Sequence, residues 1–426
     1  MLRLLRYDAQ SSHLLTHSML TFLRIGKVEF VVLMAALMAT VALSIDAVLP
    51  ALGFMANDFG TSGSEIQLII TVLFVGFVLG QIIFGPLSDR FGRLPSIYAG
   101  IVLFILGCLI TITAQSLELA LLGRFIQGIG VSGPRIMVSA LVRDCYSGRS
   151  MARIMSFVAT IFMIVPILAP MLGQAMLWLG PWQVIFAMYI VIAIILCLWV
   201  RLRLDETLLV ENRNSIQIKS LWHSFVGILT NRASCVYTIV SGFIFGGFLG
   251  YISSSQWLFQ EIYQVGEAFP IYFSALVLPN LVSSLINAKL VVKWGMFRLV
   301  QVTNVLVFFG SLSLYFYAES YNGIPPLMHT MAFLFIIFSG IGFQFGNLNA
   351  LAMEPLGRAA GIGASFVGAG STLISIPIGG LIGMSLSTNI FPLAIGMALC
   401  SLLSILMMHW VRFGFSLPKA SAEFKL

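Results

Sequence analysis

The sequence predicts an all-α integral membrane protein in which twelve transmembrane helices form two repeats of six. Three observations lead to this fold class. Hydrophobic residues make up 59% of the 426-residue chain and charged residues only 9%, whereas soluble proteins contain about 25% charged residues. The mean hydropathy is +1.00. Apolar runs long enough to cross a membrane, which takes about 20 residues, recur along the whole chain.

The apolar runs define the helices in chain order. They occupy 30–52, 66–86, 95–114, 119–142, 154–177, 181–201, 225–250, 268–292, 299–317, 327–350, 358–384 and 390–411. The longest interior polar stretch, from Arg201 to His223, follows the sixth run and divides the helices into two sets of six. Such parallel repeats are typical of a large class of transporters. The expected segments are a cytoplasmic arm over 1–29, six-helix bundles over 30–203 and 225–413, a cytoplasmic linker over 204–224 and a cytoplasmic tail over 414–426.

The positions of the cations predict the orientation of the chain. With the N-terminus inside, the outer loops contain no Lys or Arg but do contain acids such as Glu118 and Glu267. The cations within the apolar runs are Arg124, Arg135, Arg201, Arg232, Lys289 and Arg358, and the last four lie towards the inner ends of their runs. Because cations accumulate in cytoplasmic loops, both termini are expected in the cytoplasm. This division of the cations between inner and outer loops also supports the number of helices. One missed helix would place every later loop on the other side of the membrane.

The composition argues against several other functions. The net charge of +7 reflects topology rather than nucleic-acid binding, because the chain has no lysine-rich run and no basic strip with interleaved aromatic residues. The five cysteines show no metal-ligand spacing, no GxxxxGK[ST] nucleotide loop occurs, and no nucleophile–base pair suggests catalysis. We therefore expect no enzyme activity, no metal and no cofactor, and an ion gradient as the source of energy.

The loop between the second and third runs is a candidate gate. It reads GPLSDRFGR over 85–93, where glycines permit a tight turn. Its acid and arginines can pair with charges at the inner end of the fourth run. Charged inner loops are common for topological reasons alone, but a generic charge cluster does not need this spacing. The gate residues are Gly85, Asp89, Arg90, Gly92, Arg93, Arg143 and Asp144.

Asp46 and Arg124 are isolated charges inside apolar runs. A guanidinium near mid-membrane costs roughly 2.5–3.5 kcal/mol on insertion scales, so it needs a partner or a water-filled cavity. Each residue lies about 9 Å from the outer end of its run at 1.5 Å per residue, so contact between them is feasible. Ion pairing favours a charged carboxylate whereas burial favours a neutral one, and such a group can exchange a proton when its surroundings change. We assign Asp46 as the protonation site and Arg124 as its modulator; the alternative is a static structural ion pair.

Arg135 follows Arg124 by eleven positions, and at about 100° per residue both lie on one helix face. If that face lines a cavity, Arg135 can attract an anionic substrate. Alternatively, it reaches the inner interface or packs against a helix carbonyl. A roomy apolar pocket with few polar anchors suits amphipathic molecules. The candidate cavity residues are Gln127, Arg135, Tyr251, Gln256, Asn280 and Gln344.

Glycines recur at helix-packing spacing. The second run contains Gly76 and Gly80, and the eleventh run contains Gly379 and Gly380 among others. Small residues let membrane helices approach closely. These positions serve either a sliding contact between the two halves or ordinary tight packing.

With these motifs the chain resembles the major facilitator superfamily. The segment 85–93 matches the signature loop of that family, and 124–130 matches the fourth-helix signature of its proton-coupled members. The segment Ala169-Pro170-Met171-Leu172-Gly173 resembles the antiporter motif, through Ala169, Pro170 and Gly173. The segments 45–52, 140–144 and 251–255 look like those of the bicyclomycin/chloramphenicol-resistance (Bcr/CflA) branch of the drug:proton antiporters.

The resemblance implies a charge relay of Asp89, Arg93 and Asp144 that stabilises the outward-open state and breaks during the transport cycle. It implies a monomer in the bacterial inner membrane, whose partners are the lipid bilayer, a small-molecule substrate and protons, with no nucleic acid. We expect an antiporter that exports amphipathic drugs by alternating access. The alternatives are a dedicated carrier of an anionic metabolite such as a carboxylate siderophore, suggested by Arg135, and a channel or receptor on the same scaffold.

Overall fold

The computed structural model describes residues 25–209, 211, 213, 231–385 and 388–413. The N-terminal half contains α2 (Lys27–Asp46), η1 (Leu49–Ala51), α3 (Leu52–Phe59), α4 (Gly63–Ile66), α5 (Leu68–Phe91), α6 (Arg93–Ile112), α7 (Leu117–Cys145), α8 (Gly148–Leu179) and α9 (Gln183–Arg203). The C-terminal half contains α11 (Arg232–Gln256), η3 (Trp257–Ile262), η4 (Gly266–Ala268), α12 (Phe269–Trp294), α13 (Met296–Glu319), α14 (Leu327–Gly342), α15 (Gln344–Met353), η5 (Glu354–Ala359), α16 (Ala360–Ser385) and α17 (Phe391–Phe413). Within these residues the twelve predicted membrane spans are confirmed. Most of the predicted arm, linker and tail lies outside the described residues.

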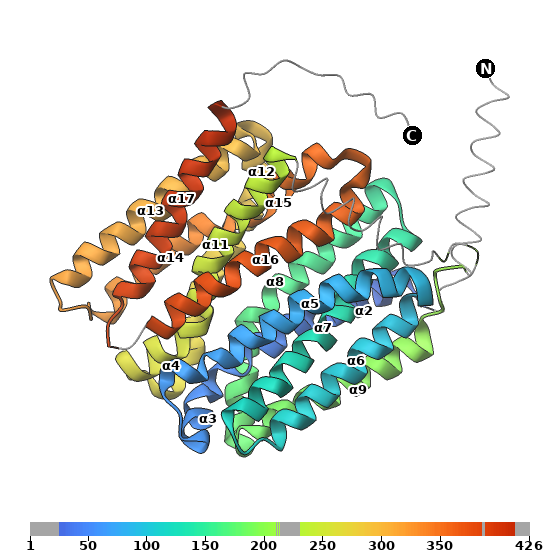
Figure 1. Ribbon diagram of the computed structural model, residues 1–426, viewed down its shortest axis with the longest axis horizontal. Coiled ribbons are helices and arrows are strands. Elements are labelled where there is room, and N and C mark those ends of the chain that lie inside the picture. The colour runs from blue at the N-terminus through green and yellow to red at the C-terminus, as the bar shows by residue number, and fades with distance from the viewer. Residues whose placement is uncertain (1–24, 210, 212, 214–230, 386–387, 414–426) are drawn as a thin grey trace.

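The helices form two bundles, one from each half of the chain (Figure 1). In the first bundle α7 packs against α5 and α6, and in the second α11 packs against α16 and α17. The bundles meet where α5 lies against α16 and where α8 lies against α12. The described residues are therefore organised as the two six-helix repeats that the sequence predicts.

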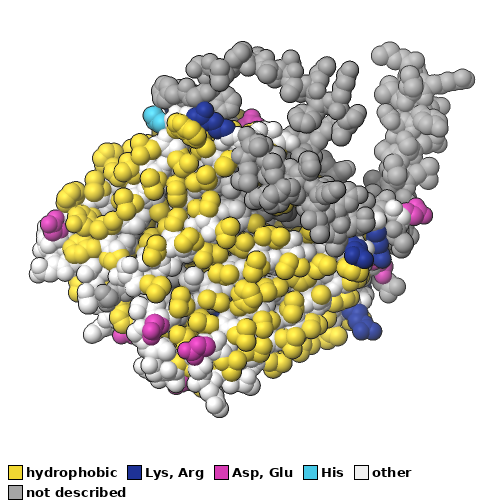
Figure 2. Space-filling view, in the orientation of Figure 1, with side chains coloured by type: hydrophobic (Ala, Val, Ile, Leu, Met, Phe, Trp, Pro, Cys, Tyr) yellow, Lys and Arg dark blue, Asp and Glu magenta, His cyan; other side chains and the backbone are white. Residues whose placement is uncertain are grey.

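The surface between the two ends of the molecule is apolar. Figure 2 shows hydrophobic side chains over most of one face, with the charged side chains towards its ends. Large apolar side chains exposed on the outside of the bundles include those of Val102, Leu198 and Phe309. Monomeric soluble proteins rarely expose continuous apolar surface of this extent. The chain is a multi-pass membrane protein whose outer surface contacts lipid.

Glycines bring helices into close contact within and between the bundles. A Cβ atom on Gly76 would overlap the backbone of Phe125 in α7, and Gly80 also packs against α7. This pair therefore serves ordinary packing within the N-terminal bundle rather than a contact between the halves. In α16 the two roles are divided, because Gly379 packs against α11 of its own bundle and Gly380 faces α5 of the other.

The first membrane span is a broken helix, which hydropathy did not predict. α2 ends at Asp46, and a turn and η1 separate it from α3. Pro50 stands in η1 and has no N–H, so it cannot donate the helical hydrogen bond to the carbonyl of Asp46. Broken membrane helices expose backbone dipoles and frequently form the ion and substrate sites of transporters.

The two bundles are in contact at the end that carries α3 and α4, here called the Trp257 end. A Cβ atom on Gly63 would overlap the ring of Trp257, and one on Gly53 would lie 3.1 Å from Nε2 of Gln256. Gly383 of α16 similarly lies against the side chain of Gln67, which stands between α4 and α5. The molecule is therefore closed at the Trp257 end. The opposite end, where α5 is followed by α6, is called the Arg93 end.

Candidate functional site

Asp46 is buried at the break in the first span. It is the last residue of α2 and is 4% exposed. Within the described part of the chain, its carboxylate takes part in no hydrogen bond and no ion pair. A Cβ atom on Gly173 of α8 would overlap the carbonyl of Ala47. The glycine of the expected antiporter motif therefore lets α8 pack directly against the break, next to Asp46.

Arg124 is fully buried and its guanidinium has neutral acceptors. Nε donates to the carbonyl of Ile69 at 3.1 Å, Nη1 to Oε1 of Gln127 at 2.6 Å, and Nη2 to the carbonyl of Ser44 at 2.9 Å. The last carbonyls of a helix have no intrahelical donor, and a cation there also interacts favourably with the helix dipole. Arg124 therefore caps the C-terminus of α2.

The expected ion pair between Asp46 and Arg124 is absent from the described residues. Asp46 and Arg124 do lie at similar depth, as expected, because Arg124 reaches the carbonyl of Ser44, two residues before Asp46. The pairing is wrong because the end of α2 supplies a carbonyl acceptor in place of the carboxylate. Tyr189 of α9 likewise donates to the neighbouring carbonyl of Leu43 at 3.0 Å.

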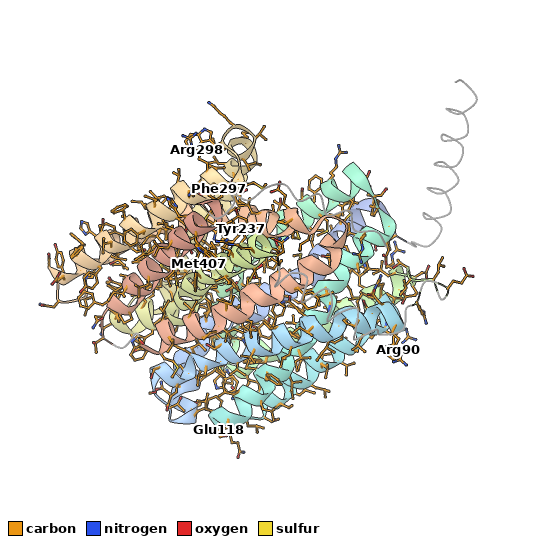
Figure 3. All side chains as sticks on the ribbon, turned by 45° about the horizontal axis from the view of Figure 1, so that its top comes forward. Arg90, Glu118, Tyr237, Phe297, Arg298 and Met407 are labelled. Atoms are coloured by element: carbon orange, nitrogen blue, oxygen red, sulfur yellow. The ribbon has the colours of Figure 1, made fainter. Side chains whose placement is uncertain are left out.

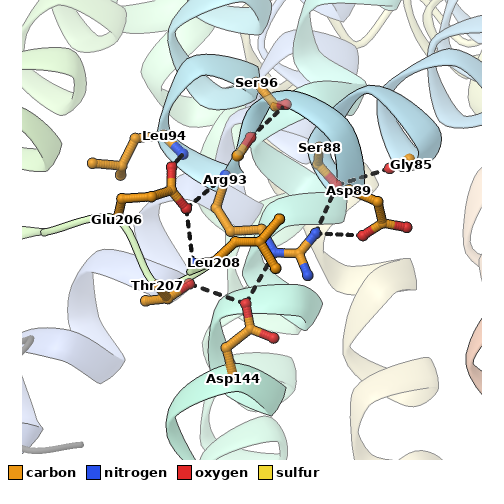
Figure 4. Close-up of polar contacts among 11 residues, drawn as sticks. Gly85, Ser88, Asp89, Arg93, Leu94, Ser96, Asp144, Glu206, Thr207 and Leu208 are labelled. Carbon is orange, nitrogen blue, oxygen red and sulfur yellow. Dashed lines mark hydrogen bonds and ion pairs between the residues drawn. The ribbon is translucent and has the colours of Figure 1, made fainter. Parts of the chain in front are cut away.

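Arg93 is the centre of the charge relay at the Arg93 end (Figure 4). Its Nη1 lies 2.6 Å from Oδ1 of Asp89, and its Nε lies 2.9 Å from Oδ2 of Asp144. Nη1 also donates to the hydroxyl of Ser88 at 2.9 Å. Gly92 joins the two helices with φ of +112°, which a residue with a side chain rarely adopts. The predicted trio of Asp89, Arg93 and Asp144 is thus in direct contact.

Glu206, beyond the end of α9, completes this network. Its two carboxylate oxygens accept hydrogen bonds from the backbone N–H groups of Arg93 at 2.9 Å and Leu94 at 3.0 Å, at the start of α6. Thr207 donates to Asp144 at 3.0 Å. The sequence pattern indicates this segment only as a polar boundary between the two sets of helices. The available signal was an acid and a hydroxyl directly after the sixth apolar run, on the same side of the membrane as the gate loop.

Two predicted gate residues lie outside the network. Arg90 stacks over the ring of Phe91 at 5.1 Å, and Figure 3 shows it pointing away from the helices. Arg143 is exposed and pairs with no other described residue. In Figure 3 Glu118 marks the opposite end of the same bundle. All members of the relay belong to the N-terminal half. Contacts within one bundle do not depend on how the two bundles meet, so the relay is intact although the Trp257 end is closed.

The six candidate cavity residues do not converge on one site. Gln127 is enclosed in the N-terminal bundle, where it bonds to Arg124 and donates to the sulfur of Cys108 at 3.3 Å. Gln344 is enclosed in the C-terminal bundle and donates to Thr303 and Asn304, each at 3.3 Å. These two amide side chains hold helices together within a bundle. Composition alone cannot tell a buried amide with this role from one that lines a cavity.

Three other candidates belong to the C-terminal half. The buried ring of Tyr251 packs against Phe273 and Phe338. Gln256 lies at the closed Trp257 end and donates to Gln260 at 3.0 Å. Asn280 lies where the backbone of α12 closely approaches Gly342 of α14.

Arg135 is the exception among the candidates. Its guanidinium lies over the ring of Phe77 in α5, at 5.3 Å from the centroid. Nε is enclosed without a hydrogen-bond partner. No described carbonyl or carboxylate accepts from the side chain, so the expected packing against a helix carbonyl does not occur. Elsewhere in the described chain, no group of His, Cys, Asp and Glu side chains is arranged to hold a metal ion.

Comparison with known proteins places the chain among transporters. Residues 33–376 match the Major Facilitator Superfamily. The chain is 30% identical to the uncharacterized MFS-type transporter YdgK of Bacillus subtilis, over 82% of this chain and 87% of the relative. It is 24% identical to a bicyclomycin resistance protein homolog of Haemophilus influenzae, over 86% of this chain and 92% of the relative. The crystal structure of a D-xylose–proton symporter shares the fold, with a TM-score of 0.68 at 15% identity over 88% of this chain and 97% of that one.

Proposed function

Because the chain belongs to the Major Facilitator Superfamily, whose members are transporters rather than enzymes, we propose that it exports amphipathic small molecules in exchange for protons. Relatives named for bicyclomycin and multidrug resistance support this substrate class. The transporter acts as a monomer in the bacterial inner membrane, with both termini in the cytoplasm and the proton gradient in place of a cofactor.

The observation that carries the proposal is the buried acid at the helix break. An ionised carboxylate without a donor would be an unpaired charge away from water, which is strongly unfavourable. The neutral acid fits the surroundings of Asp46 without such a cost. Asp46 therefore carries its proton while the Trp257 end is closed, and Arg124 fixes the end of α2 on which Asp46 stands.

Alternating access follows from the arrangement of the bundles. In the proposed orientation the Trp257 end faces outward, so the closed contact there corresponds to a carrier that faces the cytoplasm. Asp46 takes its proton from outside, the bundles then close at the Trp257 end, and substrate binding promotes release of the proton to the cytoplasm. Asp89, Arg93 and Asp144 hold the inner ends of α5, α6 and α7 together during this movement.

Proton-coupled export is tested in inverted membrane vesicles with an acidified lumen and a pH-sensitive dye. Adding a neutral drug such as chloramphenicol or a cationic one such as ethidium outside should release protons from the lumen. Asp46→Asn should abolish this release, because the amide cannot exchange a proton. Glu118→Gln is the matched control, since Glu118 is an exposed acid at the start of α7 and its loss should leave release unchanged. Uphill drug transport by Asp46→Asn would contradict the assignment.

A further inference from the structure

Arg135 is a guanidinium inside the membrane that lacks a counter-charge. Its Nε is enclosed without a partner, and its side chain forms no hydrogen bond or ion pair with another described residue. The residue is partly exposed, and its two terminal nitrogens are not among the enclosed unpaired atoms. They are therefore accessible and have donors to spare, since a guanidinium carries five N–H groups.

The side chain points into the membrane and not towards the Arg93 end. In a helix the Cα–Cβ bonds tilt towards the N-terminus, and the N-terminus of α7 lies at the opposite end. At a rise of 1.5 Å per residue, Arg135 lies about 14 Å along α7 from Asp144 of the relay. Phe77, which its guanidinium contacts, lies about 18 Å along α5 from Asp89 of the relay. The guanidinium therefore lies at least as deep in the membrane as the backbone of Arg135. It does not reach back towards the inner interface, which was one of the alternatives from the sequence.

A row of aromatic rings leads from Arg135 across the bundle interface. The ring of Phe77 lies 6.4 Å from that of Phe74, which lies 5.8 Å from Phe245 in α11. Phe245 in turn lies 6.0 Å from Phe345 in α15. The row therefore joins the N-terminal bundle to the C-terminal bundle. Phe245 and Phe345 are half-buried, so part of their surface is free to contact a ligand.

The charges in this part of the molecule leave a positive excess at Arg135. Arg124 is satisfied by three neutral acceptors, and Asp46 pairs with no described cation. A carboxylate that approached Arg135 would supply the missing acceptor. Guanidinium and carboxylate match in bidentate geometry, and a site of low polarity strengthens such a contact.

We propose that Arg135 and the row of Phe77, Phe74, Phe245 and Phe345 form the binding site for amphipathic organic anions. The carboxylate of the ligand pairs with Arg135, and its apolar body lies along the rings. The substrates then include aromatic carboxylates in addition to neutral drugs. This inference rests on the proposed function, because the site serves transport only if the two bundles alternate around it.

The site is tested by binding of two probes of nearly equal shape and different charge. Purified full-length protein in nanodiscs of zwitterionic lipid is titrated calorimetrically at pH 7.5 with 2-naphthoate and with its neutral amide, 2-naphthamide. We expect the wild-type protein to bind naphthoate about 10- to 100-fold more tightly, as expected for hydrogen bonds to a charged group. Equal affinity for the two probes would overturn the proposal without the need for any variant.

Variants then locate the preference for the anion. Arg135→Gln should remove it by weakening naphthoate alone, whereas Arg135→Lys should retain part of it. Arg153→Gln is the matched control, because Arg153 is an exposed arginine on α8, and its affinities should equal those of the wild type. Phe245→Leu should weaken both probes, since both use the aromatic row. A preference that survives in Arg135→Gln would assign the anion to another place and refute the site.

The same probes separate this inference from the proposed function. Binding in nanodiscs needs no gradient, so charge-selective binding without proton release from vesicles would leave the site standing and refute proton-coupled export. Proton release with chloramphenicol, together with charge-independent binding of the naphthyl probes, would refute the site and leave export standing.

Discussion

At the scale of single residues, the two buried ionisable side chains Arg124 and Asp46 differ in their hydrogen-bond partners. Arg124 finds carbonyl and amide acceptors from α2, α5 and its own helix. Asp46, two residues beyond one of those carbonyls, has no donor among the described residues. The first arrangement is a helix cap that fixes structure, and the second leaves a group whose protonation state can change. The roles of the two residues are therefore separable by mutation.

Arg124→Gln and Asp46→Asn should have independent effects on stability. If Arg124 caps α2 and does not pair with Asp46, Arg124→Gln should lower the thermal midpoint of the purified protein by the same amount in the wild-type and Asp46→Asn backgrounds. Effects of sites that do not interact usually add within about 0.5 kcal/mol. Removing a partner from an ion pair would instead leave a buried charge, at a cost of about 3–5 kcal/mol. A much smaller effect in the Asp46→Asn background would restore the ion-pair interpretation.

At the scale of elements, Glu206 attaches the chain after α9 to the start of α6. Its carboxylate accepts from two backbone N–H groups of the first turn, which have no acceptor within the helix. Negative charge at this position also interacts favourably with the helix dipole. The relay is thus part of a larger clamp that includes α5, α6, α7 and the segment after α9.

Glu206→Ala should loosen the first turn of α6. The amides of Arg93 and Leu94 lose their acceptors, at a cost of about 1 kcal/mol, so hydrogen exchange in a peptide that covers 92–96 should be faster. Exchange at the Trp257 end of α6 should not change. Glu211→Ala provides a control at an exposed acid nearby. Unaltered protection of 92–96 in Glu206→Ala would show that the clamp does not stabilise this turn.

At the scale of the whole molecule, closure of the Trp257 end depends on the absence of side chains. Gly63 gives the ring of Trp257 the space that it occupies, and Gly53 lies against Gln256. These contacts join the two bundles, whereas the relay at the Arg93 end lies in one bundle only. Resemblance implied a relay that breaks during the cycle. That breakage stays a prediction, since the relay is intact in this structure; the contact between the bundles at the Trp257 end is a second candidate for a contact that changes.

Gly63→Val should favour the state that is open at the Trp257 end. Spin labels at Glu65→Cys and Glu267→Cys, both exposed positions on opposite bundles, report the separation by double electron–electron resonance in a background without the native cysteines. The new side chain would overlap Trp257, so the distance distribution should shift to longer values. Gly346→Ala is the control, because a Cβ atom there meets nothing within 4 Å. The same distribution in Gly63→Val and the wild type would contradict this role.

The sequence by itself determined the number of membrane spans, the two repeats and the core of the relay. Hydropathy is a local property that each segment carries alone, so it does not depend on neighbours. The relay of Asp89, Arg93 and Asp144 is implied by the family resemblance, and the contacts of Arg93 with both acids are present. The resemblance to drug:proton antiporters, carried by these local motifs, is likewise confirmed by the relatives.

Only the tertiary structure decided the partners of the buried polar groups. Whether Arg124 meets Asp46 or the carbonyl of Ser44 depends on where α2 ends, and whether Gln344 faces a cavity or Asn304 depends on which helices enclose it. Arg135 was recognised as unusual, but its orientation towards Phe77 required the packing of α7 on α5. The physical reason is that a buried polar side chain takes the nearest available partner, and backbone groups, which every residue has, compete for it without leaving a mark in the sequence.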